Sequence, residues 1–296
     1  MRRPIPLTPA SDRNAGVPIF QRIAIVGFGL IGGSIALACR ERFAGGLLIA
    51  IDHKDVLERA MRAHAADVAG DDLVMAAEAD LVILAAPVLQ NIKVVREIAE
   101  CVSGEAIITD AGSTKRAIVE AARDLPKRLM FVGGHPLAGA AIGGFQAARG
   151  DLFQGRPWIL TPAAAEDDPH VLKLGAFVEC LGARVEVMNA AAHDLLLAHL
   201  SHLPQVTISA LMHVIGSHAG ADGLALSGRG LRDTTRLASS PAGIWKDIAA
   251  TNRDYLVRAI DDLIAVLQRM RDDERQQDLE RIFDSAARWK QALEEP

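Results

Sequence analysis

The first part of the chain alternates short apolar runs with helical segments. Five such runs lie at residues 23–26, 47–52, 79–87, 105–113 and 128–136. Two later runs, 156–162 and 183–188, flank a helical segment at 169–181. Short, continuously apolar strands that alternate with helices are typical of a parallel sheet with helices on both faces. The sequence therefore predicts an α/β fold with a Rossmann-like, mostly parallel sheet domain.

The first run ends in a glycine pattern that predicts dinucleotide binding. Gly27, Gly29 and Gly32 form G-x-G-x-x-G between a strand and an amphipathic helix, and Asp52 ends the next strand. The glycines permit a tight turn and close approach of pyrophosphate, and the acid suits the ribose hydroxyls. An unliganded tight turn is the alternative. The predicted cofactor-binding residues are Gly27, Phe28, Gly29, Leu30, Ile31, Gly32, Asp52 and Pro87.

Asp52 also bears on which dinucleotide binds. A carboxylate at this position repels a 2′-phosphate, so NAD is predicted in preference to NADP. His53 and Lys54 follow directly and are cations that could hold a 2′-phosphate. They are the residues that would explain use of NADP.

From Asn189 onward the pattern is helical. One long helix is expected over 189–218, with Pro204 inside it as a kink, followed by an irregular glycine-rich segment at 220–240. Ser240 is expected to cap a single helix that runs to Met270, and a last helix covers 273–293. Long helices with apolar stripes usually bury those stripes against a partner, so a homodimer through these helices is predicted, with packing inside the chain as the alternative.

Three domains or segments follow from these patterns. Residues 1–20 contain four prolines and predict a flexible N-terminal tail. Residues 21–188 form the predicted dinucleotide-binding domain, and residues 189–296 form the predicted helical domain for dimerisation and substrate binding.

Composition excludes several classes of protein. The net charge of −5 is spread evenly along the chain, so a nucleic-acid partner is not expected. No apolar run approaches ~20 residues, so no membrane span or membrane partner is expected. The three cysteines form no CxxC motif, which together with the lack of a signal peptide favours a reducing cytoplasm.

The stretch FVGGHPLAG, at 131–139, places His135 directly after the fifth apolar run. Gly133 and Gly134 are expected to let the backbone turn there, and Pro136 to stiffen the exit. Ligands of such folds bind at the carboxyl ends of the strands, and a histidine there is suited to remove a hydroxyl proton. A structural hydrogen bond is the alternative role.

Other polar residues follow the same logic. Ser113 ends the fourth run and is expected to cap the helix near Lys115, to face the ligand, or both. His199 and His202 share a helical face, but a third ligand with metal spacing is lacking, so no metal site is predicted. Arg236, with Asp233 nearby, suits capture of a carboxylate, and a solvated charge cluster is the alternative.

Taken in order along the chain, these motifs resemble the prephenate/arogenate (cyclohexadienyl) dehydrogenase family of tyrosine biosynthesis. The resemblance rests on GFGLIGGS, DAGSTK, GGHPLAG, LFQGRPWILTP, the HD at 193–194, SHLP, LRDTTR and the tryptophan of SPAGIWKDI. It implies a two-domain dimer that uses NAD for oxidative decarboxylation of a cyclohexadienol.

The resemblance also implies residue roles. His135 is the base on the ring C4 hydroxyl, and Ser113 orients it. Arg236 grips a substrate carboxylate. The remaining implied substrate-binding residues are His202, Trp245, Asp233 and Gln205.

The chain departs from the family pattern at three places. Ala140-Ala141 stands where many members have Thr/Ser-Glu, Gln205 replaces a second histidine, and Arg229 interrupts a glycine run. The first two changes favour arogenate or dual use over prephenate. An aminated prephenate of secondary metabolism and a non-catalytic nucleotide-binding homologue are the alternatives.

Overall fold

The computed structural model describes residues 16–43, 45–139, 143–163 and 165–294. By internal contacts the chain divides into two units. The sheet unit comprises Met1–Leu197 and Ser239–Thr251, and the helical unit comprises Ala198–Ala238 and Asn252–Pro296. Two helices from the C-terminal part of the sequence, α6 (Ala190–Leu197) and α9 (Ala242–Thr251), therefore group with the sheet. The expected domain boundary between residues 188 and 189 stays a prediction.

The described part of the sheet unit contains an eight-stranded sheet with the order β3-β2-β1-β4-β5-β6-β7-β8. The antiparallel pair is β6 with β7, and the other neighbours are parallel. The strands are β1 (Arg22–Val26), β2 (Leu47–Ile51), β3 (Val68–Gly70), β4 (Leu81–Leu84), β5 (Ala106–Asp110), β6 (Leu129–Pro136), β7 (Pro157–Pro162) and β8 (Arg184–Val187). The predicted Rossmann-like, mostly parallel sheet is confirmed.

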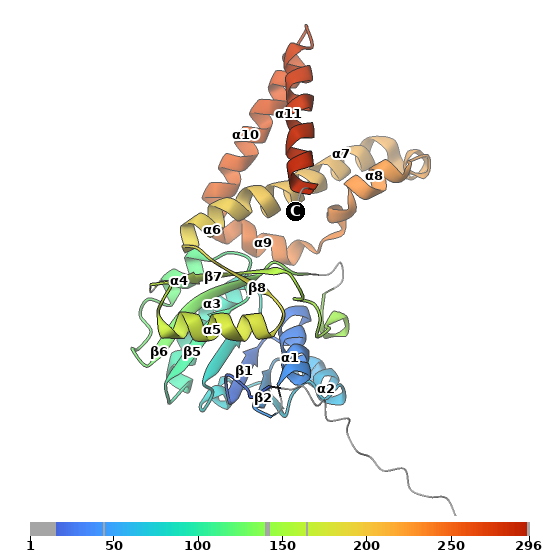
Figure 1. Cartoon of the computed structure of the whole chain (residues 1–296). Coiled ribbons are helices and arrows are strands. Elements are labelled where there is room, and N and C mark those ends of the chain that lie inside the picture. Colours follow the sequence, from blue (N-terminus) through green and yellow to red (C-terminus); the bar gives the residue numbers. More distant parts are fainter. Residues whose placement is uncertain (1–15, 44, 140–142, 164, 295–296) are drawn as a thin grey trace, which may run out of the picture. The chain divides into compact units, whose positions relative to one another are not determined.

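Helices cover both faces of this sheet (Figure 1). One face packs against α1 (Leu30–Arg42), α2 (Lys54–Arg62) and α5 (Pro169–Cys180), and the other against α3 (Val88–Cys101) and α4 (Arg116–Ala121). Two faces buried by helices explain why the strands are continuously apolar rather than alternating.

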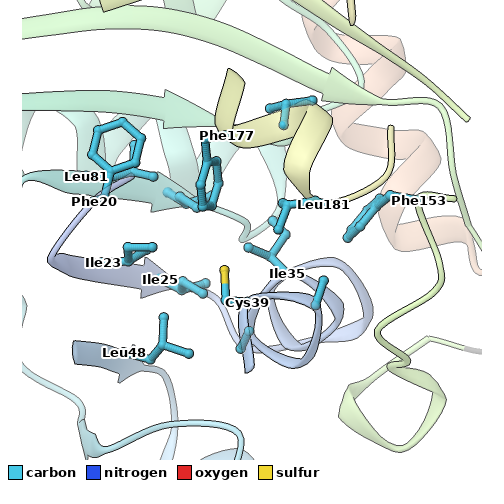
Figure 2. Close-up of a cluster of buried hydrophobic side chains, with 14 of the residues drawn as sticks. Phe20, Ile23, Ile25, Ile35, Cys39, Leu48, Leu81, Phe153, Phe177 and Leu181 are labelled. Atoms are coloured by element: carbon cyan, nitrogen blue, oxygen red, sulfur yellow. The ribbon is translucent and has the colours of Figure 1, made fainter. Parts of the chain in front are cut away.

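Figure 2 shows part of the first core, where Ile35 and Cys39 of α1 meet Ile23 and Ile25 of β1, and Phe177 of α5 lies beside Phe20. The rings of Phe20 and Phe177 pack edge to face with their centroids 5.5 Å apart. Burial raises the pKa of the Cys39 thiol to about 12, so this cysteine acts as an apolar side chain.

The C-terminal helices correct two expectations. The segment at 220–240, expected to be irregular, is largely helical, because α7 (Leu203–Ala225) continues past a non-helical Gly220 and is followed by α8 (Arg229–Thr234) and the short helix η4 (Arg236–Ser239). The single helix expected from Ser240 to Met270 is two helices, α9 and α10 (Arg253–Asp272), which separate at Asn252 with φ −129° and ψ 30°. The last helix is α11 (Gln277–Glu294).

The kink predicted at Pro204 takes the form of a π-helical turn. Residues Ala198–His202 form this turn, and Pro204 follows it directly in a helix that runs from Ala190 to Ala225, where a proline cannot donate the backbone hydrogen bond of a continuing helix. A π-helical turn inserts an extra residue into the helix and is often found at functional sites.

The helical stretch Ala190–Ala225 is more apolar than the sequence inspection expected. Its most apolar window has a mean hydropathy of 1.3, so by length and composition it could cross a membrane, and 22% of that window is buried. Exposed apolar side chains also lie elsewhere on the helical unit, on α10 and α11: Ile264, Leu267, Phe283, Trp289 and Leu293. Such exposed apolar surface in a globular protein is typical of an interface with a partner.

Candidate active site

A groove of about 510 Å³ lies at the carboxyl ends of β1, β2 and β4. Neighbouring strands β1 and β4 are where the order of the sheet reverses, which is the usual ligand site of an open α/β sheet. The groove contains four of the predicted cofactor-binding residues, Gly27, Gly29, Asp52 and Pro87. His53, which the sequence offered as a cation for a 2′-phosphate, also lines the groove. Sequence inspection missed the other polar residues of its lining, which are Asp71, Gln90 and Glu97.

Two glycines of the loop are required by its close packing. Gly27 has φ 91°, and a Cβ there would lie 2.5 Å from the backbone nitrogen of Ala86. A Cβ on Gly32 would lie 2.0 Å from the carbonyl oxygen of Gly27. In contrast, a Cβ on Gly29 would meet nothing within 4 Å, so this position faces the space in which a pyrophosphate would lie.

The start of α1 fits an anionic ligand. Its N-cap is Gly29, which has no side chain to bond the first N–H groups of the helix. Asp52 stabilises the loop itself, since its Oδ2 accepts from the Phe28 N–H at 2.5 Å and its Oδ1 from the His53 N–H at 2.6 Å. The Phe28 ring is buried and stacks on Phe145, so it packs the loop from behind. These residues suit a dinucleotide.

The strand that carries His135 does not turn at its glycines. β6 continues through Gly133 and Gly134 to Pro136 and pairs with β7, with His135 opposite Ile159. The expected glycine turn is therefore wrong, and the glycines serve close packing instead. A Cβ on Gly133 would lie 2.3 Å from the Thr161 hydroxyl, and one on Gly134 would lie 2.5 Å from the Asp110 carbonyl oxygen.

His135 begins a chain of buried hydrogen-bonded groups. Its Nδ1 lies 2.8 Å from Nε2 of His193, and Nδ1 of His193 lies 2.8 Å from Oδ1 of Asp194. The carboxylate accepts, so we assign the His193 proton to Nδ1, and the His193 Nε2 then accepts from His135 Nδ1–H. That tautomer places the lone pair of His135 on Nε2, which is the state a general base needs.

Burial and hydrogen bonding set the charge states of this chain. Desolvation lowers the pKa of His193, which keeps it neutral and able to accept a hydrogen bond. Burial pushes the pKa of Asp194 upward, but hydrogen bonds from His193, Arg116 and Lys115 outweigh it, and the pKa lies below its usual value. Asp194 is thus a carboxylate at neutral pH.

Asp194 also replaces the helix cap that the sequence assigned to Ser113. It accepts from the backbone N–H groups of Lys115 at 2.7 Å and Arg116 at 3.0 Å, and from Arg116 Nε at 3.2 Å. The N-cap residue of α4 is Lys115, which makes no side-chain cap bond. The expected cap at Ser113 is therefore wrong, because a carboxylate from α6 reaches these donors.

Ser113 and Trp245 both belong to the sheet unit, although 132 residues separate them. Two hydrogen bonds attach α9, which carries Trp245. The Thr114 and Thr251 hydroxyls lie 2.7 Å apart, and Asp247 Oδ2 accepts from the Leu89 N–H at 3.2 Å, in the first turn of α3. The fold thereby fixes the helix of Trp245 to the unit that carries His135.

The helical unit holds the other predicted substrate-binding residues. His202 is buried, and its Nδ1 lies 3.3 Å from Nδ2 of Asn252. Gln205 is also buried and donates from Nε2 to the carbonyl of Leu237 at 2.7 Å, which fixes the backbone next to Arg236. Arg236 and Asp233 are exposed. Their binding roles stay predictions, and Ala140-Ala141 lies outside the described residues.

Sequence reasoning missed His193 and Asp194 as members of the site. They belong to the HD motif at 193–194, but a neighbouring His-Asp pair on a helix indicates no specific role until the fold shows what it faces. The clue present in the sequence was two ionisable residues inside an otherwise apolar helical segment.

Comparison with known proteins identifies the family of this chain. The model of the prephenate dehydrogenase nucleotide-binding domain matches residues 35–187, and that of the prephenate dehydrogenase dimerization domain matches residues 189–287. The prephenate dehydrogenase of Bacillus subtilis is 35% identical over 269 residues, which cover 88% of this chain and 72% of that protein.

Two solved structures are also similar. Prephenate dehydrogenase from A. aeolicus, in complex with hydroxyphenyl propionate and NAD+, superposes with a TM-score of 0.85 at 26% identity and covers 93% of this chain and 98% of that one. Synechocystis arogenate dehydrogenase gives a TM-score of 0.75 at 28% identity, with 92% and 99% covered. The two matched domains, the dinucleotide groove and the histidine at the sheet edge lead to one conclusion: this chain is a member of the prephenate dehydrogenase family.

Proposed function

We propose that this chain catalyses the NAD-dependent oxidative decarboxylation of arogenate, of prephenate, or of both, in tyrosine biosynthesis. The observation that carries the proposal is the chain from His135 through His193 to Asp194 at the sheet edge that also forms the dinucleotide groove. It supports a general base on His135 Nε2, aligned by a neutral imidazole and a carboxylate.

In this reaction the protein moves one proton and holds two ligands, the substrate and NAD+. His135 Nε2 takes the proton of the C4 hydroxyl while the C4–H bond breaks and its hydride leaves, so the C4–O bond becomes a carbonyl. The C–C bond to the ring carboxylate then breaks, CO₂ leaves, and the electron pair of that bond makes the ring aromatic, with the former carbonyl oxygen protonated as a phenol. NAD+, when bound, supplies the hydride acceptor. Because aromatisation drives the reaction, the contribution of the protein is orientation. By the family motifs, Arg236 binds a substrate carboxylate. The other residues assigned to contact the substrate on the same basis are His202, Trp245 and Ser113.

NAD is the proposed cofactor because the Asp52 carboxylate lies in the groove. Two backbone N–H groups hold it there, that of Phe28 in the glycine loop and that of the adjacent His53. A 2′-phosphate there would meet a carboxylate. Equal or better kcat/KM with NADP+ than with NAD+ would contradict this choice and would implicate His53 and Lys54.

A single assay tests the function. Purified protein is mixed with NAD+ or NADP+ and with prephenate or arogenate, and reduced nicotinamide is followed by absorbance. We expect NAD+ reduction with arogenate at least as fast as with prephenate, because Gln205 stands where many prephenate-using members have an ionisable histidine. No reduction with either substrate would contradict the function, whereas reduction with prephenate only would contradict the preference.

We also propose a homodimer formed through residues 189–296. The matched dimerization domain and the exposed apolar side chains of α10 and α11 support it. Light scattering at micromolar concentration should give about twice the mass of one 31.6 kDa chain. A mass near that of one chain would rule the dimer out.

The cytoplasm is the proposed location. Cys39, Cys101 and Cys180 are free thiols in the described part of the chain, as expected in a reducing compartment.

A further inference from the structure

The strand of His135 extends beyond the neighbour that should pair with it. β5 pairs with β6 up to Thr109, opposite Val132. β6 continues four residues further, to Pro136. Over this extension β7 pairs with one edge of β6, and β5 provides no strand for the other edge. A buried backbone edge of this kind needs other hydrogen-bond partners.

Two buried side chains supply them. Asp110 Oδ1 accepts from the Gly134 N–H at 3.1 Å, and Lys115 Nζ donates to the Gly134 carbonyl at 2.7 Å. Asp110 and Lys115 form an ion pair with each other, and both side chains are fully buried. An ion pair therefore takes the place of the missing strand for the residue directly before His135.

Lys115 is also attached to the other end of the imidazole chain. Its backbone N–H donates to Asp194 Oδ1, and Asp194 holds His193, which holds the His135 ring. The side chain of Lys115 thus fixes the backbone at Gly134, and its main chain fixes the carboxylate that aligns the ring. His135 is held at two points by one residue.

The local packing is arranged around this pair. A Cβ on Gly112 would lie 2.7 Å from Asp110 Oδ2, so a side chain there would displace the carboxylate. The Gly112 N–H also donates to Asp110 Oδ2 at 2.8 Å. Burial lowers the pKa of Lys115, and the Asp110 carboxylate opposes that shift. A buried ion pair adds little net stability over an apolar pair, so its retention here calls for another reason.

We propose that Asp110 and Lys115 are positioning residues that set the place of His135 for proton transfer. The inference rests on the proposed function, since it takes His135 as the base. Neither residue contacts substrate in this assignment. Asp110 acts through Gly134, and Lys115 acts through Gly134 and Asp194.

Lys115→Met in the full chain is the direct test, because methionine keeps length and removes the donor. Misplacement of a reacting group by about 1 Å costs ~10²-fold in rate. We expect kcat to fall by about that factor, with KM and the Kd of NAD+ within about threefold of the wild type. The acidic limb of the kcat profile should move as well, since the His135 ring faces His193 and, through it, Asp194, Lys115 and Arg116.

Arg40→Met is the matched control. It breaks an ion pair of the same unit, Arg40 to Asp67 at 2.6 Å, on partly exposed side chains away from the site. This variant should lower the melting temperature and leave kcat and its pH profile unchanged. A Lys115→Met variant that behaves in the same way would overturn the proposal, because it would assign the pair to stability.

The double variant Asp110→Asn/Lys115→Met covers the case in which the single variant does not fold. It leaves no uncompensated buried charge. It should fold and still lose kcat, because the Gly134 carbonyl lacks its donor. A folded double variant with wild-type kcat, or failure of both variants to fold, would contradict the inference.

Titration of the His135 ring by NMR separates this inference from the proposed function. The titration requires no turnover. If the wild type reduces NAD+ with neither substrate, the function is wrong, yet the His135 pKa should still differ between the wild type and Lys115→Met. An unchanged His135 titration together with wild-type kcat would leave the function intact and overturn the positioning role.

Discussion

The candidate site residues of the two units differ in how they are held. In the sheet unit, His135, His193 and Asp194 are buried and bonded to one another at 2.8 Å. In the helical unit, Arg236 and Asp233 lie exposed on the short helices η4 and α8. The first set has its geometry fixed by the fold before a ligand arrives, whereas the second set lies at the surface of its unit, on two short helices that contain no buried residue.

This difference suits different tasks. Proton transfer requires a donor and an acceptor placed to a fraction of an ångström, and buried hydrogen-bonded networks supply such placement. Capture of a carboxylate by arginine tolerates adjustment of a long side chain. Substitutions in the sheet unit should therefore act on kcat, and substitutions among the exposed arginines should act on KM.

The largest expected effect is that of His135→Asn. Asparagine keeps hydrogen-bonding capacity but cannot accept the proton at neutral pH, so kcat should fall by ~10²–10⁴-fold. Substrate and NAD+ binding should change much less. The wild-type kcat/KM should decline below an apparent pKa of ~6–7, and that limb should vanish or move in the variant.

A packed histidine without a catalytic role would behave differently. His135→Asn would then lower the melting temperature and leave the pH profile of the remaining activity unchanged. Near-normal kcat with lost thermal stability would contradict the expectation that the buried residues of the sheet unit act on kcat. His202 would then be the next candidate for the base.

Arg236→Lys should have the next largest effect. Lysine keeps the charge but loses the planar fork that binds a carboxylate with two hydrogen bonds. A hydrogen bond to a charged group is worth about 1.5–3 kcal/mol, which corresponds to a KM increase of ~10-fold or more. Steady-state kinetics should show this increase with little change in the affinity for NAD+. Collapse of NAD+ affinity with an unchanged KM would refute the assignment.

His193→Asn should have a smaller effect on rate than His135→Asn. It removes one hydrogen bond to the base and leaves the base itself, so kcat should fall by roughly fivefold, in line with the ~1 kcal/mol of a typical hydrogen bond. The discriminating readout is the kcat profile, whose acidic limb should move because the His135 Nδ1 has lost its acceptor. A lower melting temperature with an unmoved profile would show that His193 only packs.

The smallest expected effect is on stability at mildly acidic pH. Burial lowers the pKa of His193 below its usual 6.5 in the folded protein, so the unfolded chain binds the extra proton first. Its contribution to the free energy of unfolding is complete above pH 6.5 and declines as the pH falls below it. The melting temperature of the wild type should drop between pH 7.5 and 5.5 by more than that of His193→Asn. Equal drops would show that His193 is not the group responsible.

Much of the sheet unit could be predicted from its pattern. The runs ending at Val26, Asp52 and Pro87 became neighbouring strands and their exits, because buried parallel strands leave a continuous apolar signature. The errors came where one residue type has two uses. Gly133 and Gly134 were assigned to a turn, but they lie inside β6, since glycine serves close packing as well as turning.

The helical unit was predicted less well, and for a related reason. The segment at 220–240 looks irregular in the sequence because of its glycines, yet most of it is helical, since glycine lowers helix propensity without excluding a helix. The break at Asn252 leaves no clear signal in the sequence. Asparagine has only a moderately low helix propensity, and the residues on either side keep an apolar helical spacing.

The sequence by itself determined the fold class, the dinucleotide loop and the identity of His135 as the residue at the sheet edge. Each of these depends on local signals: apolar strands, glycines at a strand-to-helix junction, and the position of one side chain at the end of a strand. Only the tertiary structure decided that His193 and Asp194 align that histidine and that Asp110 and Lys115 secure its strand. Those contacts join residues up to 79 positions apart, and no local pattern encodes which buried polar groups will satisfy one another.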